Sequence, residues 1–181
     1  MRRKKDMTTK EALIAARDLL ENVTPLPTDC GQLCSAACCR DSQDEDEVAG
    51  MLLFPGEAEL YKYQGTWMEL LPSSVLFDGE PVELLTCFLP CPRKHRPLAC
   101  RIFPLVPYVK YNDDGEARLT VRMDVRSKPV CPLYDSGMAG LSPEFVAKVK
   151  EALRILWADE THREYFKVLT EHLKEYDWLG I

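Results

Sequence analysis

The chain has 181 residues, of which 46% are hydrophobic, and it carries a formal net charge of −6. This composition excludes an intrinsically disordered chain, and the acidic balance argues against a general nucleic-acid-binding protein. A domain of this length buries roughly 70% of its unfolded surface, so residues 1–181 are expected to fold as one domain without disulfides.

The first predicted element is a helix that follows a capping box. Thr8 and Glu11 have the three-residue spacing at which a Thr hydroxyl and a Glu carboxylate satisfy each other's backbone N–H groups. The helix is expected to run to about Asn22, because Pro25 and Pro27 stop it. Charged residues interrupt its apolar stretch, so we interpret the segment as a helix and not as a signal peptide.

No apolar run approaches the roughly 20 residues that span a bilayer. We therefore expect a cytoplasmic protein that has no membrane partner and keeps its thiols reduced. The basic residues 2–5 are interpreted as a solvated tail, and no nucleic acid is expected to bind. Whether the chain has a protein partner is left open.

Short elements are predicted in the middle of the chain. Residues 28–50 are predicted to form a loop or short helical turns, and the acidic run over 41–47 is interpreted as a solvated loop. Met51–Phe54 is predicted as a short strand or turn, and residues 57–63 as a helical turn.

Two antiparallel pairs of strands are predicted next. Residues 66–71 and 75–77 read as strands, Asp78-Gly79 as a hairpin turn, and Pro81 places the returning strand at an edge of its sheet. Apolar and polar residues alternate over Ala117–Val125, which predicts a strand with one buried face. This strand pairs plausibly with Val106–Tyr111.

The C-terminal part of the chain, over residues 142–177, is predicted as a helical pair. Ser142, Pro143 and Glu144 form a helix start, and apolar residues recur afterwards at helical spacing. His162 and His172 are expected to be ordinary surface or packing residues of these helices. The predicted fold class is α+β, with a cysteine-rich core of loops and short antiparallel strands between an N-terminal helix and two C-terminal helices.

The eight cysteines carry most of the chemical information. In a reducing compartment, thiols gathered this densely favour metal ligation over disulfides, and soft sulfur suits zinc and iron–sulfur clusters such as [4Fe-4S]. The set can fill two four-sulfur sites, or one such site with spare thiols. The candidate metal ligands are Cys30, Cys34, Cys38, Cys39, Cys87, Cys91, Cys100 and Cys131.

Gaps of three residues separate the first cysteines of the cluster over residues 30–39. On a helix this spacing places Cys30, Cys34 and Cys38 on one face, with Cys39 pointing elsewhere. We therefore expect the adjacent Cys38 and Cys39 to have different roles. One of the two is a candidate for a buried thiol without a metal.

Basic residues surround Cys100 in the sequence, at Arg93, Lys94, Arg96 and Arg101. They are interpreted either as a solvated basic loop or as cations that offset the negative charge of a thiolate-bound metal. An anion or an acidic partner is a further reading of this segment. His95 lies among them and is a minor candidate for a metal ligand.

Common catalytic motifs are absent from the sequence. It contains no C-x-x-C redox pair, no phosphate-binding loop and no dinucleotide fingerprint. The three-then-three cysteine spacing also differs from the three-then-two spacing of radical enzymes that use adenosylmethionine. Whether the protein is an enzyme is left open.

The first cysteine cluster, followed by Arg96-Pro97-Leu98-Ala99-Cys100-Arg101-Ile102-Phe103-Pro104, resembles the zinc- or iron-chelating domain family known as the CxxCxxCC family. The resemblance covers about residues 30–131. It implies metal chelation by cysteines, with either zinc or iron as the metal, and no agreed reaction. A more distant similarity links the cysteine-rich region to flagellin lysine N-methylases, which are associated with an iron–sulfur cluster.

We therefore expect a cysteine-rich protein that chelates zinc or iron. The alternative is an iron–sulfur enzyme or electron-transfer partner, with a methylase-like, protein-modifying activity as one form of it. Chelators are expected to unfold the cysteine-rich middle of the chain.

Overall fold

The computed structural model describes residues 7–39, 50–62, 67–88 and 93–179, and these residues form the predicted α+β fold. The helices of this part are α1 (Thr9–Asp18), α2 (Gly31–Cys34), α3 (Leu98–Ile102), α4 (Pro143–Ala158) and α5 (Glu160–Leu179). The strands are β1 (Met51–Leu52), β2 (Met68–Phe77), β3 (Glu80–Cys87), β4 (Leu105–Tyr111) and β5 (Ala117–Met123). Short 3₁₀ turns connect them: η1 (Ala37–Cys39), η2 (Ala58–Leu60), η3 (Arg93–His95), η4 (Val125–Ser127) and η5 (Met138–Gly140).

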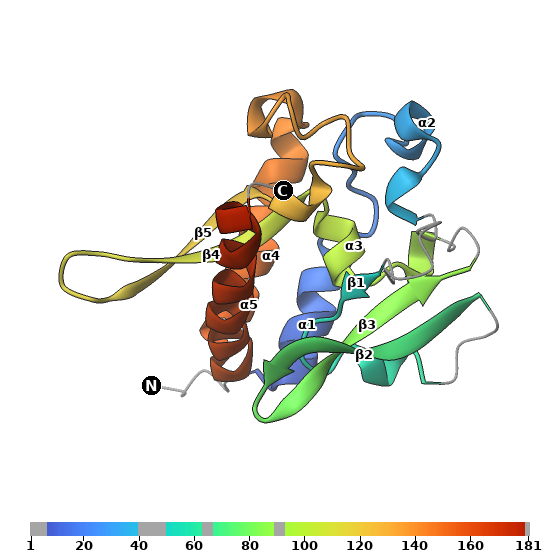
Figure 1. The fold of residues 1–181 in the computed structure, drawn as a ribbon. Coiled ribbons are helices and arrows are strands. Elements are labelled where there is room, and N and C mark those ends of the chain that lie inside the picture. Colours follow the sequence, from blue (N-terminus) through green and yellow to red (C-terminus); the bar gives the residue numbers. More distant parts are fainter. Residues whose placement is uncertain (1–6, 40–49, 63–66, 89–92, 180–181) are drawn as a thin grey trace, which may run out of the picture.

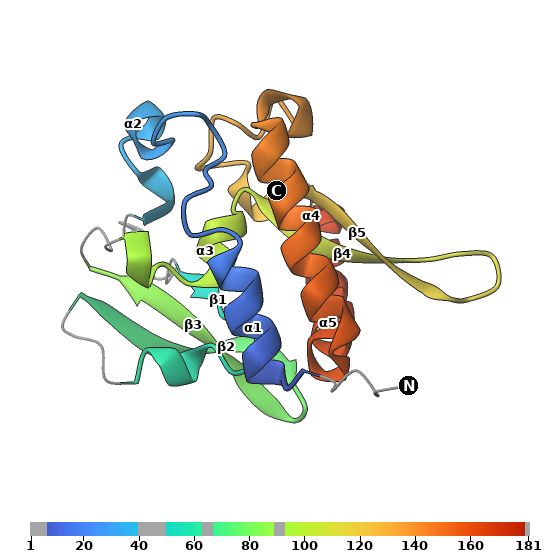
Figure 2. The same cartoon turned by 180° about the vertical axis from the view of Figure 1, so that it is seen from behind.

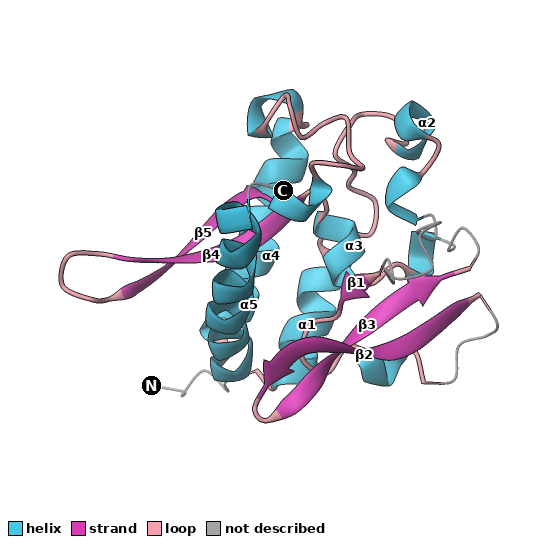
Figure 3. Cartoon of the chain, viewed as in Figure 1, coloured by secondary structure: helices cyan, strands magenta, loops and turns pink. Residues whose placement is uncertain are grey.

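The helices α1, α4 and α5 pack beside a three-stranded sheet of β1, β2 and β3 (Figure 1). Seen from behind, α1 and α4 run side by side (Figure 2). The hairpin of β4 and β5 projects from the body of the molecule beyond α5, whereas α2 and α3 lie toward the opposite side (Figure 3). None of the helices in the described part of the chain combines the length and the apolar composition that a bilayer span requires.

The capping box of α1 is confirmed. The Thr8 hydroxyl accepts a hydrogen bond from the N–H of Glu11, and the Glu11 carboxylate accepts one from the N–H of Thr8 at 2.8 Å. The helix ends at Asp18, four residues before the predicted end. Its last turn tightens there, because the N–H of Leu20 donates to the carbonyl of Arg17 at 3.0 Å while the Leu20 side chain enters the core.

The three-stranded sheet has the order β1-β3-β2, and both pairs are antiparallel. The two strands predicted before Asp78 are a single strand, β2, with an irregular register between Pro72 and Leu76. Asp78 and Gly79 have φ angles of 53° and 82°, which a two-residue type I′ turn requires, so the predicted hairpin is confirmed.

The edge position predicted for Pro81 is wrong, because β3 is the central strand of this sheet. Proline is tolerated there for a local reason. The strand β1 pairs with β3 at Leu84 and Leu85, away from Pro81, so the ladder does not use an N–H at Pro81 on that side.

The predicted pairing of the second hairpin is confirmed: β4 and β5 are antiparallel, with Val106 opposite Arg122 and Tyr111 opposite Ala117. The strand β5 ends at Met123, two residues before the predicted end, because Asp124 caps the 3₁₀ turn η4 with its side chain. Leu119 and Val121 pack against the core, as the alternation predicts.

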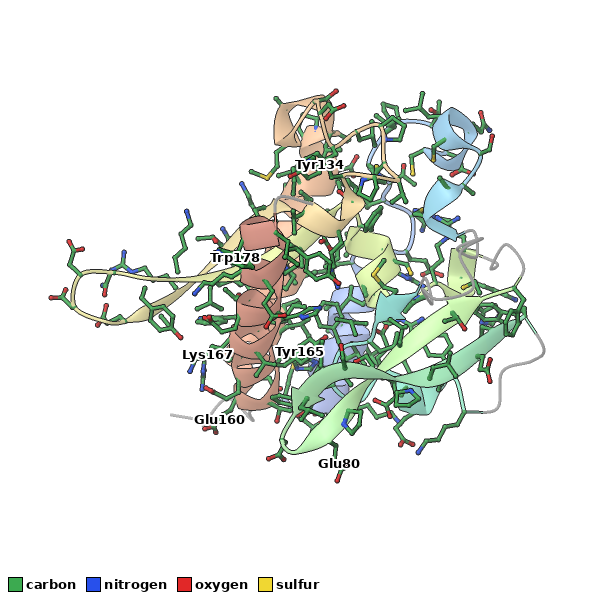
Figure 4. All side chains as sticks on the ribbon, viewed as in Figure 1. Glu80, Tyr134, Glu160, Tyr165, Lys167 and Trp178 are labelled. Carbon is green, nitrogen blue, oxygen red and sulfur yellow. The ribbon has the colours of Figure 1, made fainter. Side chains whose placement is uncertain are left out.

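The predicted pair of C-terminal helices is confirmed as α4 and α5. Their apolar faces are wholly buried at Phe145, Val149 and Leu169, and they build the main core with α1. Tyr165 of α5 points toward β2 (Figure 4), where its ring lies 5.5 Å from that of Phe77 in an edge-to-face contact.

Candidate functional site

Four of the cysteines line one cavity of about 80 Å³ between the end of α1, the α2–η1 segment, β3 and α3. They come from four separate places in the fold: Cys30 precedes α2, Cys38 lies in η1, Cys87 ends β3 and Cys100 lies on α3. A water molecule needs roughly 10–15 Å³ measured in this way, so the cavity is larger than a gap left by imperfect packing. The fold therefore gathers thiols that are as much as 70 residues apart in the sequence, from Cys30 to Cys100.

The position of Cys100 depends on a buried carboxylate that precedes η2. Glu57 is completely buried, and its Oε1 accepts a hydrogen bond from the N–H of Leu98 at 2.5 Å while its Oε2 accepts one from the N–H of Phe54 at 3.3 Å. Leu98 is the first residue of α3, so Glu57 binds the helix at the end where N–H groups lack partners. Burial raises the pKa of Glu57, while the backbone bond from Leu98 and the charge of Arg17 oppose that shift.

Two arginines in the cavity wall bind backbone carbonyls. The Arg93 guanidinium donates to the carbonyls of Glu21 at 3.0 Å and Val23 at 2.7 Å, just after α1. The Arg101 guanidinium donates to three more carbonyls, all at 3.0 Å, on Arg96, Arg17 and Lys94. Neither side chain belongs to a solvated loop, so that interpretation is wrong for these two residues.

The arginine cluster leaves the cavity rich in positive charge. Burial lowers the pKa of Arg101, and the neighbouring charges of Arg17 and Arg93 lower it further. Arg96 also lines the cavity, and its charge lowers the pKa of Cys30 against the stronger opposing effect of burial. A site with this electrostatic character favours an anionic occupant.

No family model, no curated protein and no solved structure matches this chain. What the site can do is therefore inferred from its own residues.

The first cysteine cluster does not form the continuous helical face that its spacing predicts. The helix α2 ends at Cys34, and Ser35 and Ala36 follow with left-handed φ angles of 53° and 57°. The chain then turns back into η1, which returns Cys38 to the cavity that Cys30 also lines. Cys34 is not among the described residues of the cavity wall. The single-face prediction is therefore wrong, because a left-handed turn interrupts the helix.

Cys131, in the segment after η4, is likewise not among the described residues of the cavity wall. Burial is the main reason why the pKa of Cys131 is raised, and the charge of Cys34 adds to it. Hydrogen bonding by the backbone of Leu133 and Tyr134 opposes that shift, and the N–H of Tyr134 donates to the carbonyl of Cys131 at 3.0 Å. The thiols Cys30, Cys34 and Cys131 carry no disulfide.

Several predicted site residues lie elsewhere or outside the described residues. Cys91, the acidic run over 41–47 and the basic residues 2–5 fall outside them, and for Cys39 the backbone alone is described, in η1. His95 is not among the described residues that line the cavity, and its carbonyl accepts a hydrogen bond from the Tyr61 hydroxyl at 2.8 Å. Within residues 7–39, 50–62, 67–88 and 93–179, no three His, Cys, Asp or Glu side chains are arranged to hold one metal ion.

The sequence analysis did not identify Glu57, Tyr61 or Arg17 as residues of the site. Their side chains hydrogen-bond to the backbone of the segment over residues 95–98, which precedes Cys100. Glu57 follows a Pro-Gly turn in an otherwise unremarkable segment, and no local pattern distinguishes a buried carboxylate from an exposed one. Arg17 places its guanidinium 5.7 Å from the centre of the Tyr61 ring and donates to the carbonyl of Arg96 at 3.3 Å. These contacts depend on the tertiary fold.

Proposed function

We propose that this protein binds metal through cysteine thiolates, with the centre in the cavity that Cys30, Cys38, Cys87 and Cys100 line. The observation that carries the proposal is the meeting of these four thiols, from four separate segments, on the wall of one cavity. Thiolates are soft ligands that select zinc, copper(I) and iron–sulfur clusters over hard cations. Zinc and iron are also the metals that the sequence resemblance implies.

The size of the cavity supports an iron–sulfur cluster such as [4Fe-4S] over a single zinc ion. A structural zinc ion draws four sulfurs to about 2.3 Å from one point and leaves little space between them. Here the thiols surround about 80 Å³, and among the described residues no three ligand side chains converge on one ion. A cluster carries its own bridging sulfides and so holds its four cysteines farther apart.

The charge of the cavity wall supports the same occupant. A cluster or an ion bound by four thiolates carries net negative charge, which Arg93, Arg96 and Arg101 offset from the wall. Arg93 and Arg101 are held by carbonyl oxygens, so their charges have fixed positions and need no carboxylate partner to hold them. Such preorganised cations stabilise an anionic centre without reorganising when it binds.

The remaining residues of the wall hold and shield the site. Glu57 fixes the start of α3, and with it Cys100, while Arg101 joins α3 to the end of α1. Apolar side chains of Leu20, Val23 and Phe103 line the cavity and limit the access of water. A cluster bound there supplies either one-electron chemistry or a structural cross-link between α1, α3 and β3.

The test is the metal content of protein purified without oxygen. We expect iron and acid-labile sulfide in equal amounts and a broad visible absorption that bleaches on reduction. Cys87→Ser and Cys100→Ser should lose most of both, whereas Cys131→Ser, outside the cavity wall, should retain them. Zinc without sulfide would support chelation but overturn the cluster. A wild-type protein without metal, or cavity variants that retain all of it, would overturn the proposed function.

A further inference from the structure

The hairpin of β4 and β5 is a sheet of only two strands, so each of its strands has one outer edge. Figures 1 and 3 show this hairpin projecting from the body of the molecule. No residue of β5 is buried, whereas β4 is buried over Leu105–Pro107 and again at Val109. The outer edge of β5 is therefore the accessible one.

The hydrogen bonds around the hairpin establish which backbone groups point outward. In an antiparallel pair, residues opposite each other alternate between those that exchange hydrogen bonds and those that do not. The N–H of Asn112 donates to the carbonyl of Glu116 at 3.1 Å, which fixes this alternation at the turn. Val109 and Leu119 then form a pair without mutual bonds, and the N–H of Val109 accordingly donates outward to the Thr170 hydroxyl at 2.9 Å. The N–H and carbonyl of Leu119 point to the opposite edge, away from β4.

The two outer edges of the hairpin differ in their partners. The edge of β4 is closed, because Thr170 of α5 accepts the N–H of Val109 and Pro107 has no N–H to present. The strand β5 contains no proline and pairs in a continuous register. Among the described residues, none accepts the outward N–H of Leu119 or Val121. A regular open edge of this kind is a template for pairing with a further strand.

The charge changes sign along β5. Acidic residues lie at the turn of the hairpin and directly before the strand, at Asp113, Asp114 and Glu116, and basic residues follow at Arg118 and Arg122. Antiparallel pairing of two copies about a twofold axis brings the acidic end of one strand beside the basic part of the other. The edge of β5 is therefore complementary in charge to itself.

Arg122 retains donors for a carboxylate of another chain. Its Nη1 donates to Asp177 of α5 at 2.9 Å, and its guanidinium lies 4.0 Å from the centre of the Tyr108 ring. Its Nε and Nη2 have no acceptor among the described residues. Within one copy, the hydrogen-bonding capacity of this guanidinium is therefore only partly satisfied.

One register of two β5 strands fits these charges. A twofold axis at Thr120 places Arg118 opposite Arg122 of the second copy, and like charges directly opposite each other are destabilising. With the axis at Leu119, Glu116 instead lies opposite Arg122 of the second copy. Arg118 then lies opposite Thr120 of the second copy, which carries no charge. Only outward-facing residues pair through their backbones in this register, as an antiparallel ladder requires.

The same register joins the apolar faces of the two strands. Ala117, Leu119 and Val121 share one face of β5 and pack against the core only in part. With the axis at Leu119, this residue meets its own copy, and Ala117 lies opposite Val121 of the second copy. Apolar cross-strand pairs stabilise a sheet, so pairing covers side-chain surface as well as the backbone edge.

We propose that the outer edge of β5 binds a second copy of this chain, so that two hairpins form one antiparallel four-stranded sheet with its twofold axis at Leu119. The outward N–H and carbonyl groups of the two β5 strands bind each other, and Glu116 of each copy pairs with Arg122 of the other. The contact is independent of the proposed metal centre, because no residue of the hairpin is among the described residues that line the cavity.

The experiment is sedimentation velocity of the full chain from micromolar to submillimolar concentration, under reductant so that no disulfide links two copies. Wild type should pass from monomer to dimer as its concentration rises. Leu119→Pro removes an outward N–H at an edge position and should abolish the dimer. Glu116→Lys places a cation opposite Arg122 of the second copy and should raise the dimer dissociation constant about tenfold. The matched control is Glu80→Lys, the same charge change at an exposed position of the other hairpin, and it should dimerise like wild type.

Three results would overturn the proposal. They are a wild type that stays monomeric at the highest concentration, a Leu119→Pro dimer as tight as that of wild type, and equal dissociation constants for Glu116→Lys and Glu80→Lys. Should Leu119→Pro lose its circular dichroism signal, hydrogen exchange of wild type decides in its place. The N–H of Val121 should exchange more slowly at high than at low protein concentration, and equal rates would count against the dimer.

Discussion

The Glu57 carboxylate accepts a hydrogen bond from the N–H of Leu98 across 41 residues of sequence, at 2.5 Å. The second oxygen of the same carboxylate binds the N–H of Phe54. One buried side chain thus joins the segment after β1 to the helix that carries Cys100. Because Glu57 is wholly buried, its removal takes away the acceptor that both N–H groups have inside the protein.

Replacement of Glu57 by Ala should therefore be strongly destabilising. It leaves two backbone N–H groups buried without acceptors, and we expect a loss of about 2–4 kcal/mol in the free energy of unfolding. Glu57→Gln keeps one acceptor oxygen and should cost less than Glu57→Ala. Urea denaturation followed by circular dichroism measures both. The control is Glu59→Ala, an exposed residue of the following turn, which should change the free energy by less than about 0.5 kcal/mol.

Local sequence patterns predicted the elements that local chemistry determines. The capping box at Thr8 and Glu11, the hairpin at Asp78-Gly79 and the start of α4 at Ser142 all depend on residues within a few positions of one another. These patterns therefore specify structure before any tertiary contact forms.

The arrangement of the site depended on contacts that no local pattern reveals. The spacing of the first cysteines predicted one helical face, but the non-glycine residues Ser35 and Ala36 adopt left-handed angles that local propensity disfavours. The basic segment gave no indication that Arg93 and Arg101 bind carbonyls near the end of α1. The list of cysteines could be read from the sequence, whereas the meeting of Cys30, Cys38, Cys87 and Cys100 on one cavity could not.

A lysine at position 101 should not be able to replace the three hydrogen bonds that the Arg101 guanidinium donates to backbone carbonyls. A guanidinium presents five donors in a planar fork, whereas an ammonium is a compact charge that cannot reach three separate carbonyls. Arg101→Lys should lower the free energy of unfolding by about 1–3 kcal/mol and reduce the metal retained after purification. Lys94→Gln, at an exposed position in η3, is the matched control and should behave like wild type. Equal stability of Arg101→Lys and wild type would show that these bonds are dispensable.

Strain at Ala36 predicts a substitution that stabilises the chain. Its φ of 57° disfavours any residue with a Cβ atom, and glycine adopts this angle without that cost. Ala36→Gly should raise the free energy of unfolding by about 0.5–1 kcal/mol, the strain relieved exceeding the entropy added to the unfolded chain. Ala37→Gly, at the next position and within η1, gains no such relief and should be neutral or destabilising. A lower denaturation midpoint for Ala36→Gly than for Ala37→Gly would contradict the prediction.

The buried His162 predicts a loss of stability in mild acid. Its Nδ1 lies 2.8 Å from Oδ2 of Asp159, and the other oxygen of that carboxylate, Oδ1, accepts a hydrogen bond from the Thr9 hydroxyl at 3.1 Å. Burial lowers the pKa of His162 below its ordinary value of 6.5, although Asp159 acts in the opposite direction. Below pH 6.5 the unfolded chain therefore binds a proton that the folded chain does not yet bind, so stability falls from that pH toward the folded-state pKa.

The burial of His172 lowers its pKa as well and adds to the same trend. We expect the urea midpoint of wild type to be lower at about pH 5.5 than at about pH 7.5. His162→Gln removes the titrating group, so its midpoint should fall by less between the same two pH values, even though its stability at neutral pH is reduced by the altered contact with Asp159. Metal binding by thiolates also weakens in acid, and it affects both proteins alike. A fall in His162→Gln as large as that of wild type would show that the acid sensitivity arises elsewhere.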